Sequence, residues 1–86
     1  MPTISSFFSI KIFMNWNDHK PPHFHAKYNN YSAAFDLDGN VIAGYLPIKE
    51  KRLVLAWLEL HREELNDNWL RAEKKEELCK IEPLKK

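Results

Sequence analysis

The side chains best suited to chemistry lie together in one short segment, Asp18-His19-Lys20-Pro21-Pro22-His23-Phe24-His25, which holds three of the four histidines and a carboxylate. His23 and His25 are two residues apart, and residues with this spacing on a strand project to the same face. The two prolines before them restrict the loop, so ordering it costs little entropy. This segment is therefore where we expect a site.

Metal binding is one chemistry that the segment could perform. The candidate ligands are one carboxylate and three imidazoles, those of Asp18, His19, His23 and His25. Nitrogen and oxygen donors in this combination suit zinc or non-haem iron, so zinc or another divalent metal is the candidate cofactor, and the sequence does not establish that one is bound. The alternative is structural, in which the same side chains hydrogen-bond the loop backbone and shape the start of the next strand.

Acid–base catalysis without a metal is the second chemistry. His23 and His25 are the candidate catalytic residues, because neighbouring imidazoles can supply a neutral base and a charged acid near pH 7. We expect Lys27 and Asp36 to lie close enough to bias those protonation states. The natural target is a phosphodiester bond in RNA, although the sequence shows no obvious basic track for a phosphate backbone. The fold would have to bring five basic side chains together to form such a track, those of Lys11, Lys27, Lys49, Lys51 and Arg52. Whether the protein is an enzyme stays open.

The composition limits what surrounds this site. The 86 residues suffice for one domain with a modest core, and the formal net charge is +1 from 13 basic and 12 acidic side chains. This balance argues against DNA binding by an exposed helix, which needs a basic bias. The single cysteine, Cys79, cannot form an internal disulfide, which fits a reducing compartment. The sequence shows no signal-peptide pattern and no apolar run near ~20 residues, so we expect a cytoplasmic protein that does not contact the membrane.

Hydrophobic periodicity predicts the elements that position these residues. From Ile10 onward apolar residues alternate, which indicates a strand. Asn29-Asn30 and either Asp38-Gly39 or Gly39-Asn40 are favoured hairpin turns between later strands. The predicted strands lie within residues 4–16 and at 23–28, 31–37 and 41–46.

A long helix is predicted to follow this sheet. Pro47 suits the first helical position, and residues 48–78 contain neither Gly nor Pro. A break near Asn66-Asp67-Asn68 is the alternative to one continuous helix over 47–78. Residues 79–86 are expected to form a frayed tail. The expected fold is therefore a single α+β domain, an antiparallel four-stranded meander over residues 1–46 with one C-terminal helix packed on one face.

The turn at Asn29-Asn30 also sets which side chains share a face of the sheet. The predicted core face holds Phe24, Ala26, Tyr28, Tyr31, Ala33, Phe35, Leu37, Ile42 and Leu46. The helix should cover it with a stripe of Val54, Trp57, Leu58, His61, Leu65, Trp69 and Ala72.

The opposite face should carry both imidazoles, together with the candidate partner-binding residues Lys27, Asp36 and Tyr45. His61 belongs to the helix stripe and should lie apart from His23 and His25. We expect its ring to bond a buried carbonyl or hydroxyl, for which Tyr28 or Tyr31 is a candidate. The alternative is that a cleft opens between helix and sheet and that His61 lines it.

Several of these motifs are shared with a known family. They are Met1-Pro2-Thr3-Ile4, Asp18-His19 with Pro21-Pro22-His23-Phe24-His25, Tyr28, Leu46-Pro47, Leu53-Val54, Trp57, His61, Glu64-Leu65 and Trp69. Together they resemble the bacterial family called domain of unknown function 4160, over nearly the whole chain. Ser9 departs from it, because the family often places a glycine there, and this leaves a bend at Ser9 undecided.

The resemblance implies a setting rather than an activity. Proteins of this family are often encoded beside another small domain of unknown function, numbered 2442, in pairs suggested to be toxin–antitoxin-like. The expected function is therefore a partner-binding module of a two-gene pair, with a homodimer as an alternative assembly and nucleic-acid binding undecided. The runner-up is a histidine-centred metal protein or hydrolase, such as a ribonuclease, that uses the segment from Asp18 to His25.

Overall fold

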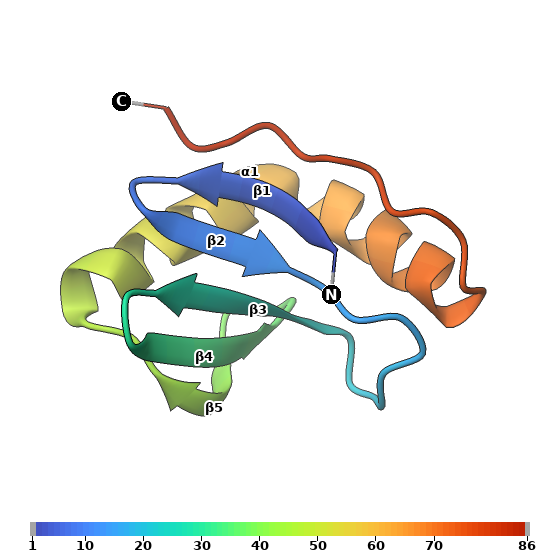
Figure 1. Ribbon diagram of the computed structural model, residues 1–86, viewed down its shortest axis with the longest axis horizontal. Coiled ribbons are helices and arrows are strands. Elements are labelled where there is room, and N and C mark those ends of the chain that lie inside the picture. Colours follow the sequence, from blue (N-terminus) through green and yellow to red (C-terminus); the bar gives the residue numbers. More distant parts are fainter. Residues whose placement is uncertain (1, 86) are drawn as a thin grey trace.

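The structure, a computed structural model, describes residues 2–85 as one antiparallel sheet and one long helix (Figure 1). Each strand of the sheet pairs with the next one along the chain. The strands are β1 (Thr3–Phe7), β2 (Ile10–Phe13), β3 (His23–Tyr28), β4 (Tyr31–Asp36) and β5 (Val41–Tyr45). The helix, α1 (Ile48–Glu73), follows β5. The α+β class with an antiparallel meander and a C-terminal helix is confirmed, but the sheet has five strands and not four.

The strand predicted within residues 4–16 is a hairpin made of β1 and β2. Phe8 and Ser9 form its turn, with φ angles of 49° and 66°. Positive φ at both central residues is typical of the type I′ turn, which usually contains Asn or Gly. Because an aromatic residue and a serine occupy the turn here, its sequence carries no turn signal.

The next hairpin has the predicted register. The Asn29-Asn30 turn joins β3 to β4, and the facing pairs are Phe24 with Phe35, Ala26 with Ala33 and Tyr28 with Tyr31. The connection from β4 to β5 is longer than the predicted two residues. β4 ends at Asp36, residues 37–40 form the loop, and the pairing of β4 with β5 is irregular between Ala34 and Phe35.

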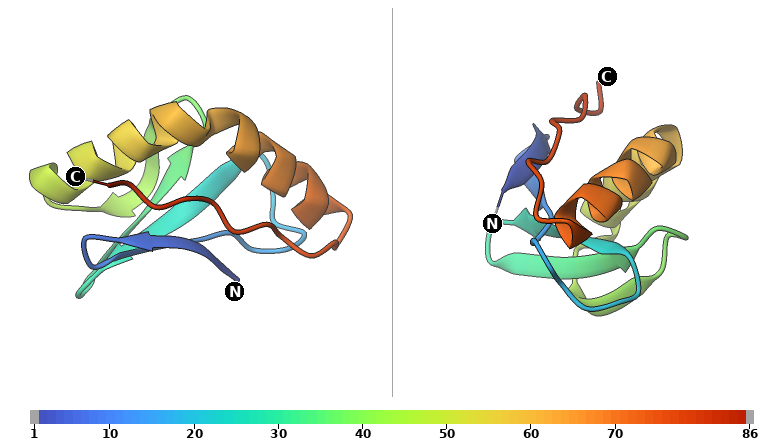
Figure 2. Two further views of the ribbon diagram at one scale, coloured as in Figure 1. Left: turned by 90° about the horizontal axis from the view of Figure 1, so that it is seen from above. Right: turned by 90° about the vertical axis from the view of Figure 1, so that its right-hand side faces the viewer.

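The core lies between the sheet and α1, which crosses one face (Figure 2). Most predictions for this face are confirmed, since Phe24, Ala26, Ala33, Phe35 and Leu46 are buried. Two are wrong: Tyr31 is 43% exposed and Ile42 is 42% exposed. Tyr31 lies at the end of a hairpin. Ile42 is the residue skipped by the irregular pairing of β5, where Val41 faces Phe35 and Ala43 faces Ala34. The helix stripe is buried as predicted except at His61, which is partly exposed.

The other face of the sheet is not covered by α1, and we call it the open face. Along the paired strands it includes Ser6 on β1, Lys11 and Phe13 on β2, His25 and Lys27 on β3, Ser32 and Ala34 on β4, and Ala43 and Tyr45 on β5. On β2 and β3 these residues alternate with buried ones, as the period of a strand requires.

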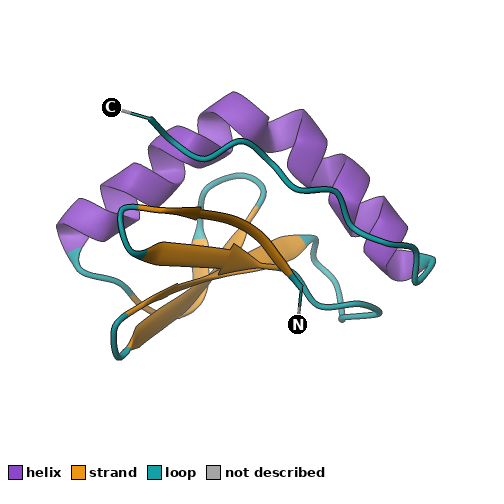
Figure 3. Cartoon of the chain, turned by 45° about the horizontal axis from the view of Figure 1, so that its top comes forward, coloured by secondary structure: helices purple, strands orange, loops and turns teal. Residues whose placement is uncertain are grey.

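The helix is continuous through Asn66-Asp67-Asn68, and it bends at His61 instead, where φ is −126° and ψ is 22°. Figure 3 shows α1 arching over the sheet, so that its second half reaches the loop between β2 and β3. Pro47 immediately precedes the helix rather than opening it. No helix within residues 2–85 is both long enough and apolar enough to cross a lipid bilayer.

The helix ends at Glu73 and not at Leu78. Lys75 has φ 60°, and the Glu76 amide donates to the Arg71 carbonyl at 2.8 Å. This arrangement is that of a Schellman motif, in which glycine is the usual left-handed residue. With a lysine in that position, the sequence gives no sign of where the helix stops.

The tail is packed and not frayed, which corrects the prediction for residues 79–86. The Ile81 amide donates to the Ile4 carbonyl at 2.8 Å, so the tail runs beside β1 and α1 (Figure 2). The buried Asn68 side chain bonds both backbone groups of Cys79, at 2.8 and 2.9 Å. The Trp57 indole donates to the Glu82 carbonyl at 2.8 Å. These polar anchors extend the core beyond the helix, since Ile81 is 4% exposed.

Candidate functional site

The candidate site lies between the end of β2 and the start of β3. Residues 14–22 form the connecting loop, which is tied to the end of α1 by two hydrogen bonds. The Asn17 amide donates to the Ala72 carbonyl at 3.1 Å, and the Trp16 indole donates to the Glu76 carbonyl at 3.0 Å. The loop is thereby fastened against the helix, and it places Asp18 next to the first residues of β3.

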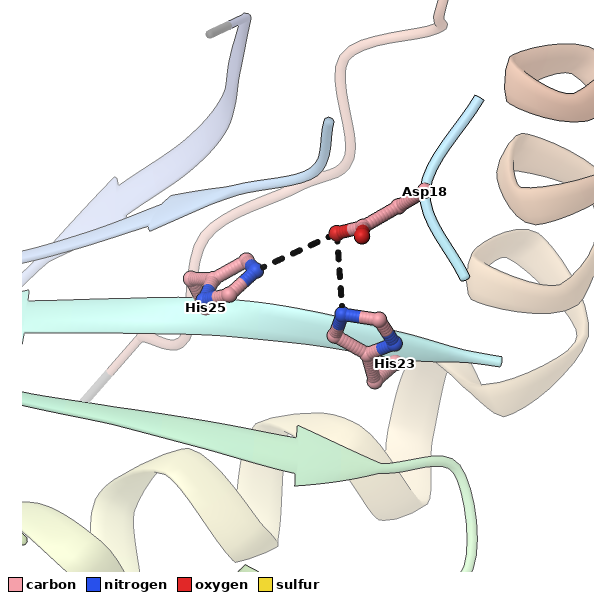
Figure 4. Close-up of side chains that lie close together, drawn as sticks. All are labelled: Asp18, His23 and His25. Atoms are coloured by element: carbon pink, nitrogen blue, oxygen red, sulfur yellow. Dashed lines mark hydrogen bonds and ion pairs between the residues drawn. The ribbon is translucent and has the colours of Figure 1, made fainter. Parts of the chain in front are cut away.

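Three side chains converge at this point, those of Asp18, His23 and His25 (Figure 4). Asp18 Oδ2 lies 3.0 Å from His23 Nε2 and 3.7 Å from His25 Nε2. One donor atom from each residue lies within 4.8 Å of the other two. The fold therefore brings together three of the four residues that the sequence nominated as metal ligands.

The His23 ring has a contact on each nitrogen. Nδ1 lies 2.7 Å from the Pro21 carbonyl oxygen, which can only accept, so Nδ1 carries a hydrogen. Nε2 faces the Asp18 carboxylate, which is also an acceptor. A neutral His23 would thus place two acceptors face to face. The contact requires positive charge between them, which is either the second proton of an imidazolium or a metal ion.

His23 corrects the prediction that both imidazoles lie on an open surface. Its side chain is 2% exposed, and its ring centroid lies 5.3 Å from that of Trp69 on α1. The reason is its place at the first residue of β3, where the loop and the end of the helix meet. His25 is 27% exposed and stacks on Phe13 with ring centroids 5.2 Å apart. The cluster therefore has a buried side at His23 and an accessible side at His25.

The Nε2 atom of His25 is buried and has no hydrogen-bond partner among the described residues. Burial disfavours the imidazolium form and, together with the charge of His23, lowers the pKa of His25 below its usual 6.5. His25 is therefore neutral at pH 7, which is the form in which an imidazole nitrogen binds a metal.

Asp18 is ionised beside these rings. Burial by itself would raise the pKa of the Asp18 carboxyl. The hydrogen bond from the His19 amide, at 2.8 Å, and the neighbouring His23 outweigh burial, so that the pKa lies below the usual 3.8. The Asn15 side chain also donates to Asp18 Oδ2, at 3.5 Å. Sequence reasoning did not nominate Asn15, and its only signal is a polar amide three residues before the aspartate.

Two histidines lie outside the cluster. His19 is 85% exposed, and its Nδ1 lies 3.2 Å from the second carboxylate oxygen of Asp18. His61 Nδ1 lies 2.6 Å from the Glu64 carboxylate, one turn along α1, and not against a tyrosine hydroxyl or buried carbonyl as predicted. The Glu64 carboxylate, which is 51% exposed, therefore takes the place of the predicted partner.

Two of the three predicted partner-binding residues lie in one row across the open face, because Ser32 on β4 pairs with both Lys27 and Tyr45. Lys27 is exposed on the open face, and Tyr45 is 63% exposed on β5. The Asp36 carboxylate accepts hydrogen bonds from the Asp38 amide and from the amide and side chain of Asn40. It therefore organises the loop at residues 37–40, and Asp18 is the carboxylate that neighbours the imidazoles.

Fold and site together define a small α+β domain with an Asp-His-His cluster where its third strand begins. Residues 9–70 match the family described as "Domain of unknown function (DUF4160)". The match spans more than half of the chain, and the chain belongs to this family. The matched range contains the whole cluster. No curated protein and no solved structure matches the chain.

Proposed function

We propose that the protein binds a divalent metal ion through Asp18, His23 and His25. The observation that carries the proposal is the buried Nε2 of His25, which has no hydrogen-bond partner within residues 2–85 and lies 3.7 Å from an ionised carboxylate. A buried polar atom without a partner destabilises a fold by about 1–3 kcal/mol. A cation between the three donor atoms would satisfy this nitrogen and would also separate the facing acceptors of His23 and Asp18.

The separations between donor atoms support this proposal. Zinc bonds of about 2.0–2.2 Å place neighbouring ligands of one ion roughly 3–3.5 Å apart. The 3.0 Å between Asp18 and His23 lies in that range, and the 3.7 Å to His25 needs only a small movement of one side chain. The bond from His23 Nδ1 to a carbonyl is also typical of a metal-binding histidine, because it fixes the tautomer and directs Nε2 at the ion.

Two imidazoles and one carboxylate leave coordination positions open, as in catalytic zinc and non-haem iron sites. A metal there would supply Lewis-acid polarisation of a substrate oxygen. The side chains of Asp18 and His25 are 21% and 27% exposed, although His25 Nε2 is itself buried, so we propose that substrate approaches from their side of the cluster. Acid–base catalysis by the imidazole pair alone is less favoured, because the 2% exposed His23 cannot reach a substrate directly. We therefore propose that the protein is a metal-dependent hydrolase, and that a ribonuclease is one such activity.

Metal titration tests this function. We expect the purified protein, stripped with chelator, to bind one Zn²⁺ or Co²⁺ per chain in competition with a chromophoric chelator. Asp18→Ala and His25→Ala should each weaken binding by more than about 100-fold, beyond the usual effect of a supporting residue. His19→Ala is the matched control and should bind normally. A wild-type protein that takes up neither metal would refute the proposal.

A second candidate function, binding of a partner protein, is favoured by the edge strand β5. Every residue of β5 is exposed, and it carries no charge. The tail runs beside β1, at the other edge of the sheet. An apolar edge strand is a template for the addition of a strand from another chain. The proposed partner is the neighbouring-gene protein of the domain of unknown function 2442 type, in a toxin–antitoxin-like pair in the cytoplasm, and a second copy of this chain is the alternative.

Co-expression with that neighbour tests the partner proposal. Ile42→Lys on β5 should abolish co-purification, because a charge on an edge strand blocks strand addition. Leu60→Lys is the matched control, since Leu60 is 69% exposed on α1 and far from the edge strand in sequence. Equal co-purification of the wild type and Ile42→Lys would exclude β5 as the interface.

A further inference from the structure

Two lysines face one another on the open face, where two strands meet. Lys11 on β2 pairs directly with Lys27 on β3, and both are exposed. Like charges in this position destabilise a sheet. Neither ammonium has an ion-pair partner among the described residues. The pair is thus an uncompensated positive site, of the kind that an anion would stabilise.

The surroundings of this pair suit a phosphate next to a ring. Ser32 pairs with Lys27 on the next strand, so its side chain projects from the same face of the sheet as the two lysines. One step along the strands, about 7 Å away, is a parallel row in which His25 pairs with both Phe13 and Ala34. A shallow hollow of about 200 Å³ lies there, lined among others by His25, Phe13, Ala34 and Ala43. Its small alanine side chains leave room for a flat ring against the stacked His25 and Phe13.

The carboxylates of the sheet region do not compete for this surface. Asp18 belongs to the Asp-His-His cluster, and Asp36 is engaged by Asp38 and Asn40. The cationic pair, the hollow and the cluster are connected through one residue, because His25 both lines the hollow and points its Nε2 at Asp18.

We propose that the open face binds single-stranded RNA, with two successive phosphates on Lys11 and Lys27, one on each ammonium, and an adjacent base in the hollow beside His25. Sheets that recognise unpaired RNA combine basic side chains with rings on which bases stack. The Ser32 hydroxyl is placed to bond the ribose 2′-hydroxyl, the group that distinguishes RNA from DNA. The inference deepens the proposed function by naming its substrate, since a strand bound here passes the accessible side of the metal cluster. Binding itself uses side chains that do not touch a metal.

Fluorescence anisotropy with a labelled oligouridylate, in chelator and over a range of salt concentrations, tests this inference. Two phosphate contacts predict that log Kd rises with log salt concentration with a slope of about 1.4, at about 0.7 per contact on a single strand. Lys11→Ala and Lys27→Ala should each reduce the slope to about 0.7. Lys49→Ala removes an equal charge from α1 and should leave it unchanged. Ser32→Ala should narrow the preference for RNA over the matching deoxyoligonucleotide.

Several outcomes would overturn the inference: no binding, a slope unaffected by the Lys11 and Lys27 variants, or equal affinity for RNA and DNA in the wild type. The inference would also be overturned if a protein partner occupies the open face. This would appear as slower hydrogen exchange of the Lys11 and Lys27 amides when that protein is added, but not when RNA is added. Asp18→Ala separates the two proposals, because it should lose metal and still bind RNA. If the wild-type protein binds RNA but takes up no metal, only the proposed metal-dependent function is refuted, and the RNA-binding inference stands.

Discussion

His23 Nε2 lies 3.0 Å from Asp18 Oδ2, while the opposite nitrogen of the same ring is held by the Pro21 carbonyl. The histidine therefore cannot turn its protonated nitrogen toward the carboxylate and leave the other one free. Either a second proton or a metal ion must lie between the two residues. The pair is thus a fixed receptor for positive charge, and His25 adds a neutral nitrogen at its open side.

Metal binding should stabilise the fold. A ligand that binds only the folded state at 100 times its Kd contributes about 2.7 kcal/mol. For a chain of this length, that corresponds to a rise of roughly 10–20 °C in Tm. Thermal unfolding with Zn²⁺, reversed by chelator, measures it. His19→Ala should show the full rise and His25→Ala almost none, whereas equal rises in the two variants would place the metal elsewhere.

The tail should contribute to stability through Asn68. Asn68→Ala removes two buried hydrogen bonds to Cys79 and should lower the free energy of unfolding by about 2–3 kcal/mol. Urea unfolding measures the loss, and hydrogen exchange at the Ile81 amide should accelerate as the tail loosens. The exposed neighbour Asn66→Ala should change neither quantity. A tail that exchanges equally fast in the wild type would argue against its docking.

The β1–β2 turn should accept glycine. Ser9 has φ 66°, a conformation that costs an ordinary residue about 1–2 kcal/mol. Ser9→Gly removes this strain but makes the unfolded chain more flexible, which cancels part of the gain. The net effect should be a rise of about 0.5–1 kcal/mol in the free energy of unfolding. Ser6→Gly, inside β1, should have the opposite sign. The account of the turn fails if both substitutions destabilise the protein in urea unfolding.

Asp36 should make stability depend on acid pH. Burial by itself would raise the pKa of the Asp36 carboxyl. The hydrogen bonds from Asn40 and the loop amides outweigh burial, so that the pKa in the folded state lies below the usual 3.8. Its contribution is therefore present above the unfolded pKa and is lost as the pH falls through the lower folded value. At pH 7, Asp36→Ala should cost about 1–2 kcal/mol.

The pH dependence is checked by urea unfolding of the Asp36→Ala variant at pH 7 and at successively lower pH. The difference from wild type should shrink once the pH is below 3.8, and Asp38→Ala, which removes an exposed carboxylate from the same loop, should have little effect. A difference that stays constant down to the lowest pH would contradict this role for Asp36.

The sequence predicts the fold wherever local chemistry and tertiary context agree. Asn29-Asn30 tolerates the turn it forms, so the register of β3 and β4 follows directly. The errors arise where other residues adopt backbone conformations that glycine usually provides. The β1–β2 turn at Phe8 and Ser9 and the end of α1 near Lys75 therefore cannot be recognised from the sequence. The packing of the tail depends on long-range contacts such as Asn68 with Cys79, which have no local signal.

The candidate site was predictable in part. The two-residue spacing of His23 and His25 correctly places both imidazoles toward Asp18. Strand parity could not reveal that α1 buries His23 against Trp69, since this depends on how the helix lies across the sheet. Neither could it separate His19 from the cluster, because the direction of a loop side chain is not periodic.

Crystals of the protein grown with Zn²⁺, with anomalous diffraction recorded at the zinc absorption edge, test the central claim most directly. We expect a single strong peak at about 2.0–2.2 Å from Asp18 Oδ2, His23 Nε2 and His25 Nε2. An empty position between these atoms at saturating zinc, with His23 still bonded directly to Asp18, would contradict the assignment of this cluster as a metal centre.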